Sequence, residues 1–143
     1  MDRIRECIQY SDNRSILECN EKGKSYKILN SNGKRISKVK VDGCVSQDEG
    51  EKRCDYLFLS EGEEVKQVIF VELKGGRLKD ALQQIIDTVE YLREVFKDFK
   101  KKGRIIGSRD IPRFENNPEF KKLHKLLQGD VMRRTNKYFE ETI

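Results

Sequence analysis

A run of four apolar residues near the middle of the chain constrains the fold most. Val68–Val71 reads VIFV, with no polar residue alternating with the apolar ones. This pattern is typical of a strand that is covered on both faces, as in sheets that carry helices. From Leu78 to Phe99 apolar residues recur at spacings of three and four, which predicts a long helix that ends at Gly103. A central strand with a helix packed on it is therefore the expected unit.

The segment Arg104–Ser108 predicts a short strand after that helix. A strand, a long helix and a strand in succession indicate a crossover with parallel pairing. The other predicted elements, with the central strand included, are strands at Ser15–Cys19 (alternatively a short helix), Tyr26–Leu29, Arg35–Val41, Cys54–Leu59 and Val65–Leu73, a helix at Glu119–Gln128 and a last strand within Val131–Ile143. Together they predict a single α/β domain over residues 1–143, with a mixed sheet of about four or five strands flanked by helices.

Length and charge limit the functions of the chain. Its 143 residues fit one domain with one core, and its formal net charge of +5 has the sign expected for a protein that binds a polyanion. No apolar run approaches the ~20 residues that span a bilayer, and the charged start MDRIRECIQYSD does not provide the apolar stretch of a signal peptide. We therefore expect a cytoplasmic protein without a membrane partner.

The cysteines and the histidine argue against several kinds of site. The four cysteines form no Cys-x-x-Cys pair and His124 is the only histidine, so the usual zinc ligand sets are not available. Disulfides are not expected in a reducing cytoplasm. A hydrolase with a catalytic histidine would have to use His124, which has no nucleophile motif nearby and is interpreted as a surface histidine.

Acidic and basic side chains meet at the end of the central strand. Glu72 and Lys74 are two residues apart, so on a strand they share a face. If this strand pairs with the preceding one as a hairpin, Asp55 lies across from Glu72, because both are at similar distances from the connecting loop. Two carboxylates hold a cation such as Mg²⁺ that binds a phosphate, and a nearby lysine positions or deprotonates the attacking water. Metal-assisted phosphodiester hydrolysis requires this set of residues.

A purely structural explanation is also open. Glu-x-Lys triplets are common in so charged a chain, and Glu64-Val65-Lys66 and Glu119-Phe120-Lys121 also occur. Charged residues at the end of an apolar strand are often only its solvated end. Glu72-Leu73-Lys74 differs from the other two triplets because it ends a buried-type strand, follows a strand that carries Asp55 and precedes Gly75-Gly76 and a helix. This context favours a catalytic role.

The order of Asp55, then Glu72-Leu73-Lys74, then a helix bearing Gln84 resembles the PD-(D/E)xK nuclease superfamily, whose restriction-endonuclease-like fold is shared by many restriction enzymes and Holliday junction resolvases. The similar stretch covers about residues 41–106. The resemblance implies that Asp55, Glu72 and the carbonyl of Leu73 bind Mg²⁺, with Mn²⁺ able to replace it. It also implies that Lys74 is the catalytic lysine and that Gln84 is a supporting polar group.

The chain departs from the family pattern at several positions. Cys54 stands before the aspartate in place of proline, and Thr88 stands where some members carry a tyrosine. Many members also take an acidic ligand from the first helix, for which Glu6, Glu18 and Asp42 are the candidates. The subfamily and the third metal ligand therefore stay open.

Several basic residues are candidates for contacts with a nucleic-acid backbone. We single out Lys38, Lys40, Arg77, Arg109 and Arg113. The expected function is a Mg²⁺-dependent endonuclease that hydrolyses phosphodiester bonds in DNA, with RNA as an alternative substrate. The rival is a non-catalytic module of the same fold that binds nucleic acid or a partner protein in a defence or toxin–antitoxin system.

We also expect a homodimer, because a duplex has two strands related by a local two-fold axis and each active site cuts one of them. Apolar residues between Phe114 and Ile143 provide interface candidates, although a core-facing helix and a final strand explain the same residues. Core and interface are therefore alternatives for this part of the chain.

Overall fold

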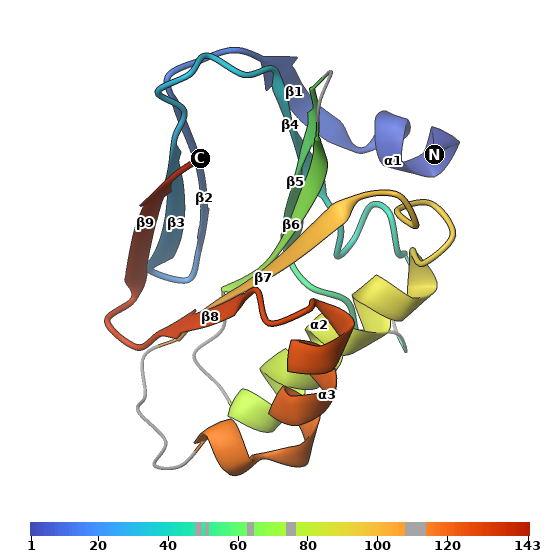
Figure 1. Cartoon of the computed structure of the whole chain (residues 1–143), viewed down its shortest axis with the longest axis vertical. Helices are drawn as coiled ribbons and strands as arrows, with labels where there is room; N and C mark the ends of the chain where they lie inside the picture. The colour runs from blue at the N-terminus through green and yellow to red at the C-terminus, as the bar shows by residue number, and fades with distance from the viewer. Residues whose placement is uncertain (48–49, 51, 63–64, 74–76, 108–113) are drawn as a thin grey trace.

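The computed structural model describes residues 1–47, 50, 52–62, 65–73, 77–107 and 114–143. Six strands form one mixed sheet in the order β1-β4-β5-β6-β7-β8, and three strands form a second sheet in the order β2-β3-β9 (Figure 1). In chain order the elements are α1 (Asp2–Glu6), β1 (Ile8–Asp12), β2 (Ile16–Glu21), β3 (Lys24–Leu29), β4 (Ile36–Lys40), β5 (Tyr56–Glu61), β6 (Lys66–Leu73), α2 (Leu78–Tyr91), β7 (Lys100–Ile106), η1 (Phe114–Asn116), α3 (Pro118–Leu126), β8 (Val131–Arg134) and β9 (Tyr138–Thr142). The predicted α/β class and mixed sheet are confirmed, but the larger sheet has more strands than the sequence suggests.

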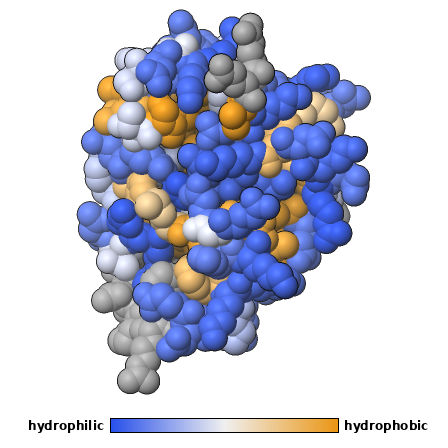
Figure 2. Space-filling view, in the orientation of Figure 1, coloured by the Kyte–Doolittle hydropathy of each residue, from blue (hydrophilic) through white to orange (hydrophobic). Residues whose placement is uncertain are grey.

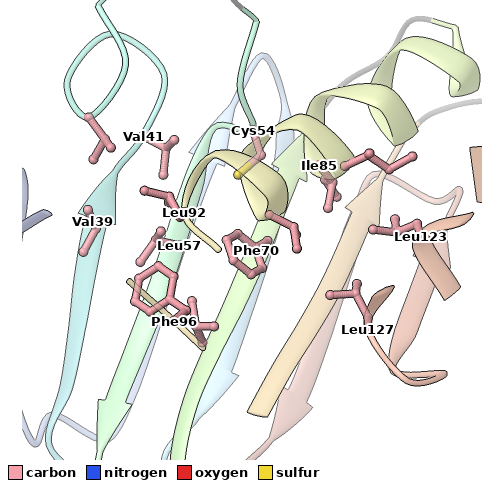
Figure 3. Close-up of a cluster of buried hydrophobic side chains, with 14 of the residues drawn as sticks. Val39, Val41, Cys54, Leu57, Phe70, Ile85, Leu92, Phe96, Leu123 and Leu127 are labelled. Carbon is pink, nitrogen blue, oxygen red and sulfur yellow. The ribbon is translucent and has the colours of Figure 1, made fainter. Parts of the chain in front are cut away.

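The larger sheet is the middle layer of the molecule. Helices α2 and α3 cover one of its faces, and the smaller sheet packs against the other (Figure 1). Along β6, Val68 and Phe70 pack in the cluster under the helices, whereas Ile69 and Val71 pack in the cluster between the sheets. Figure 3 shows the cluster under the helices, which includes Phe70 of β6 and Ile85 of α2. Burial on both faces explains the unbroken apolar run of β6.

The predicted crossover is present. Strands β6 and β7 are parallel neighbours, paired from Gln67 and Lys100 to Leu73 and Ile106. Helix α2 connects them and packs on the sheet. Strand β5 pairs with β6 in the antiparallel sense, as expected for a hairpin. The central part of the fold thus follows directly from the apolar pattern of the sequence.

The predicted length of the long helix is wrong. Helix α2 ends at Tyr91, and the chain continues through turns until β7 begins at Lys100. Leu92, Phe96 and Phe99 keep the helix-like spacing because the turns also direct these side chains into the core, where each is at most 8% exposed. The lysines expected at a helix end therefore lie in β7, where their backbone pairs with β6.

The two ends of the chain add elements that the sequence does not predict. Helix α1 and strand β1 precede the first expected strand, and β1 pairs with β4 at the edge of the larger sheet. The expected last strand is two strands, since β8 pairs with β7 whereas β9 pairs with β3 in the smaller sheet. Lys137 has a φ of 66° in the turn between β8 and β9. This turn moves the chain from one sheet to the other.

Three of the interface candidates of the C-terminal part are buried in the core. Leu123, Leu127 and Phe139 are each at most 4% exposed. Met132 and Tyr138 are 41% and 38% exposed. The explanation by core packing therefore holds for the first three residues, and the homodimer stays a prediction.

A buried arginine connects the two sheets. Arg104 of β7 donates from Nε to Glu141 of β9 at 2.6 Å and from Nη2 to Asp130 at 3.0 Å. The hydroxyl of Tyr26, on β3, donates to the same carboxylate of Glu141 at 2.8 Å. Only 3% of the Arg104 side chain is exposed, so its charge is compensated almost entirely by these acids.

The prediction that disulfides are absent is wrong for this structure. Cys7 and Cys44 form a disulfide, whereas Cys19 and Cys54 are buried free thiols. The pairing of β1 with β4 brings the two cysteines together, and the carbonyl of Cys7 accepts a hydrogen bond from the Lys40 amide at 3.1 Å. Cysteine spacing alone does not reveal this proximity, because 37 residues separate the two positions.

In the part of the chain that the structure describes, the exposed large apolar side chains are those of Ile16, Val65, Tyr91, Met132 and Tyr138. The face seen in Figure 2 is mostly hydrophilic, with apolar side chains in separate areas. Among the described residues, no helix has the length and the apolar character needed to cross a membrane.

Candidate active site

The ends of β5 and β6 bring two acidic side chains together. The register pairs Tyr56 with Val71, and the next positions outward are Asp55 and Glu72. Asp55 Oδ2 accepts a hydrogen bond from the backbone amide of Leu73 at 2.8 Å. The carboxyl group of Glu72 also lies close enough to Asp55 to affect its pKa. The two candidate metal ligands therefore lie side by side, as the hairpin pairing predicts.

Burial dominates the electrostatics of this pair. Glu72 is 1% exposed, and burial raises the pKa of Asp55. The hydrogen bond from the Leu73 amide and the neighbouring Glu72 carboxyl group oppose this rise, as does the positive charge of Lys40. Two carboxylates close together repel each other unless a proton or a cation lies between them. The pair therefore offers a place for a cation.

Helix α2 holds the backbone just before Asp55. Gln84 is 8% exposed, and its Nε2 donates to the carbonyl of Arg53 at 3.3 Å. Thr88 Oγ1 accepts from the amide of Cys54 at 2.9 Å and donates to the carbonyl of Gln84 at 2.6 Å. Gln84 therefore faces the candidate site, and the two side chains fix the path of the chain that presents Asp55.

The sequence predicts a role for Gln84 at the site but does not predict that Thr88 binds the backbone before Asp55. Thr88 appears only as a departure from the family pattern at the sequence level, whereas the structure makes it a link between α2 and Cys54. A polar residue one helical turn after Gln84 is the signal that identifies it. Gln83 is exposed and donates to Asp87 at 2.8 Å, as expected for a solvated neighbour.

Cys54 is not a nucleophile in this environment. Its thiol is fully buried, and burial together with the negative charge of Glu72 raises its pKa well above the ordinary value. A thiol with such a pKa stays protonated near neutral pH, and the thiolate is the reactive form. Cys54 Sγ instead lies 3.5 Å from the carbonyl oxygen of Tyr56.

Three of the predicted site residues lie outside the described residues: Lys74, Arg109 and Arg113. Arg77 is exposed directly before α2. Lys38 and Lys40 are half-buried on β4, on the side of the sheet that carries Tyr56. His124 is exposed on α3 beside the ring of Phe120, as expected for a surface histidine.

None of the three candidates for a third acidic ligand, Glu6, Glu18 and Asp42, is among the main groups that affect the pKa of Asp55. Glu6 forms an ion pair with Arg3 on α1, and Asp42 lies in a bridge with Ser46. Glu21, at the end of β2, instead adds a negative charge that raises the pKa of Asp55. Sequence reasoning did not identify Glu21, because only the packing of the smaller sheet on the larger one brings β2 near this site.

The carboxyl pair is suited to a hard divalent cation. No group of three His, Cys, Asp or Glu side chains that could hold a metal ion is present in the described part of the chain. Mg²⁺ commonly uses one or two protein carboxylates and completes its shell with water.

The chain has no match among protein-family models, curated proteins or solved structures.

Proposed function

We propose that this protein is a metal-dependent nuclease that hydrolyses phosphodiester bonds in DNA. The observation that carries the proposal is the pair of neighbouring carboxyl groups, Asp55 and Glu72, which the β5–β6 register places across from each other at the end of β6. Glu72 is buried and Asp55 is half-buried, and two acids so close destabilise a fold unless a proton or a cation lies between them. A structural role explains such a pair poorly, because apolar residues would pack there without this cost. Cation binding explains why the acids are present.

The residues of the chain fit this chemistry. Asp55, Glu72 and the carbonyl of Leu73 would hold Mg²⁺ or Mn²⁺. When bound, the ion supplies charge neutralisation at the scissile phosphate and lowers the pKa of a water molecule. Lys74 follows the strand directly and would position or deprotonate that water. Gln84 holds the chain before Asp55 in place through the carbonyl of Arg53.

A cleavage assay tests the proposal. Duplex, single-stranded and branched DNA and RNA are incubated with the protein in Mg²⁺, Mn²⁺ or EDTA. We expect DNA cleavage that requires the metal, and a loss of at least about 100-fold in rate for Asp55→Asn, Glu72→Gln and Lys74→Ala. Asp98→Asn is the matched control, because it removes an exposed carboxylate in the turn before β7, away from the pair, and should keep full activity. Equal activity of the wild type and Asp55→Asn would overturn the proposal.

Thermal melting provides a readout that does not depend on cleavage. Mg²⁺ or Mn²⁺ should raise the Tm of the wild type and of Asp98→Asn but not that of Asp55→Asn, since a ligand stabilises the folded state that binds it. DNA binding that weakens with salt, without cleavage in any metal, would instead identify a binding module. No binding to any nucleic acid would point to recognition of a protein.

A further inference from the structure

A strip of alternating rings and ammonium groups crosses the larger sheet beside the carboxyl pair. We call Tyr10, Lys38, Tyr56 and Lys40 the lysine–tyrosine strip. Lys38 Nζ lies 5.7 Å from the ring centroid of Tyr10 and 4.9 Å from that of Tyr56. Lys40 Nζ lies 4.5 Å from the same Tyr56 centroid. Cation–π contacts thus hold both ammonium groups in defined positions.

The strip leads to the candidate active site. Tyr56 follows Asp55 in the chain and pairs with Lys40 across β4 and β5. The amide of Val41 donates to the carbonyl of Asp55 at 3.0 Å, which joins the two backbones at this point. Lys40 also lies close enough for its charge to lower the pKa of Asp55. Lys40 is therefore the end of the strip nearest the carboxyl pair.

Acidic groups around the strip leave its two lysines available. Asp12 is occupied by Arg14, which donates to it at 2.7 Å and lies over the outer ring, Tyr10, at 3.6 Å. The negative charge of Glu18, on β2, favours the charged form of Lys38. The negative charge of Glu21, at the end of β2, helps to raise the pKa values of Tyr56 and Asp55. In the described part of the chain no salt bridge to Lys38 or Lys40 is present within 4.0 Å. Partial burial has removed water from Lys38 and lowers its pKa.

We propose that the lysine–tyrosine strip binds the phosphodiester backbone of the DNA strand that enters the active site, with Lys40 nearer to the cleaved bond and Lys38 farther along the strand. This inference rests on the proposed nuclease function and adds the face over which the substrate lies. The two lysines are neighbours on one strand face, roughly 7 Å apart along the backbone. Cations already cover the rings of Tyr10 and Tyr56, so the strip contacts phosphates and does not stack bases. Binding along it is therefore independent of base sequence.

A binding titration in EDTA tests the strip without cleavage. The fluorescence anisotropy of labelled single-stranded DNA is measured at several salt concentrations. The double variant Lys38→Gln/Lys40→Gln should raise Kd about tenfold and reduce the slope of log K against log salt by about 1.4, since each lost contact with single-stranded DNA removes about 0.7. The control Lys97→Gln/Lys100→Gln removes two exposed lysines near the start of β7, at the opposite end of the β6–β7 pairing from Glu72, and should leave the slope unchanged.

A single substitution gives an independent test if the double variant does not fold. Glu18→Gln removes the negative charge that acts on Lys38 and should lower Kd several-fold. An unchanged Kd in this variant, or an unchanged slope in a folded Lys38→Gln/Lys40→Gln protein, would overturn the inference while leaving the nuclease proposal intact. Base-dependent binding that is lost with the two lysines would also contradict it. If the wild type binds no nucleic acid, the nuclease proposal fails as well.

Discussion

Asp55 carries an energetic cost that a single substitution can reveal. Burial raises its pKa above the ordinary 3.8, so the folded state favours the protonated form. The protonated Asp55 carboxyl group therefore stabilises the folded state below pH 3.8, and this stabilisation is lost as pH rises through the raised pKa. Asp55→Asn cannot ionise and keeps an oxygen for the Leu73 amide. In EDTA at pH 7 we expect this variant to be more stable than the wild type, with a free energy of unfolding higher by on the order of 1 kcal/mol.

Urea unfolding at two pH values measures this effect. The difference between Asp55→Asn and the wild type should vanish near pH 3, where the wild-type carboxyl group is protonated. Asp98→Asn serves again as the control and should change stability little at either pH, because Asp98 is exposed. A less stable Asp55→Asn protein at pH 7 would mean that the charged carboxylate is a net contributor to the fold.

At the scale of elements, the disulfide between Cys7 and Cys44 ties α1 to the turn after β4. It closes a loop of 37 residues, which corresponds to about 3–4 kcal/mol of unfolded-state entropy at 25 °C. Cys7→Ser, or reduction of the wild type with a dithiol, should therefore lower the free energy of unfolding by about that amount. Chemical denaturation with and without reductant measures it.

The same experiment includes its own control. Reductant should have no effect on the Cys7→Ser variant, because Cys19 and Cys54 are already free thiols. The loop from Val41 to Ser46 also hydrogen-bonds to itself, with the Val41 carbonyl accepting from the amides of Cys44 and Ser46. Equal stability of oxidised and reduced protein would show that these backbone bonds, and not the disulfide, hold the loop.

At the scale of the whole molecule, Arg104 holds the smaller sheet to the larger one. Arg104→Met keeps much of the side-chain volume but leaves the carboxylates of Glu141 and Asp130 partly buried without their cation. Removing one partner of a buried ion pair costs about 3–5 kcal/mol. Chemical denaturation should show this loss. Arg93→Met, at an exposed arginine, is the control and should change stability little.

A double variant separates charge from packing in the same network. Arg104→Met/Glu141→Gln removes one of the uncompensated charges, so it should be more stable than Arg104→Met alone. Tyr26 keeps an acceptor in the glutamine oxygen, since its hydroxyl donates to Glu141. If the double variant is the less stable of the two, lost packing rather than an uncompensated charge explains the effect of Arg104→Met.

The apolar pattern of the sequence predicted an element correctly where burial of that element alone determines the pattern. The apolar run of Val68–Val71 and the spacing after Leu78 predicted the central strand and its helix, because burial on both faces or on one stripe leaves a direct trace in the sequence. The same pattern failed beyond Tyr91, since turns and helices both bury residues at spacings of three and four. Charges at Lys100–Lys102 suggested a helix end, although backbone pairing with β6 places them in a strand.

The sequence by itself determined the α/β class, the parallel crossover and the proximity of Asp55 to Glu72, because each depends on neighbours in the chain or on one hairpin register. Only the tertiary structure decided the second sheet, the disulfide and the nearness of the Lys40 and Glu21 charges to Asp55. These features join segments far apart in the chain, such as β3 and β9. Such features are stabilised only when both distant segments are packed together, so a short stretch of sequence does not predict them.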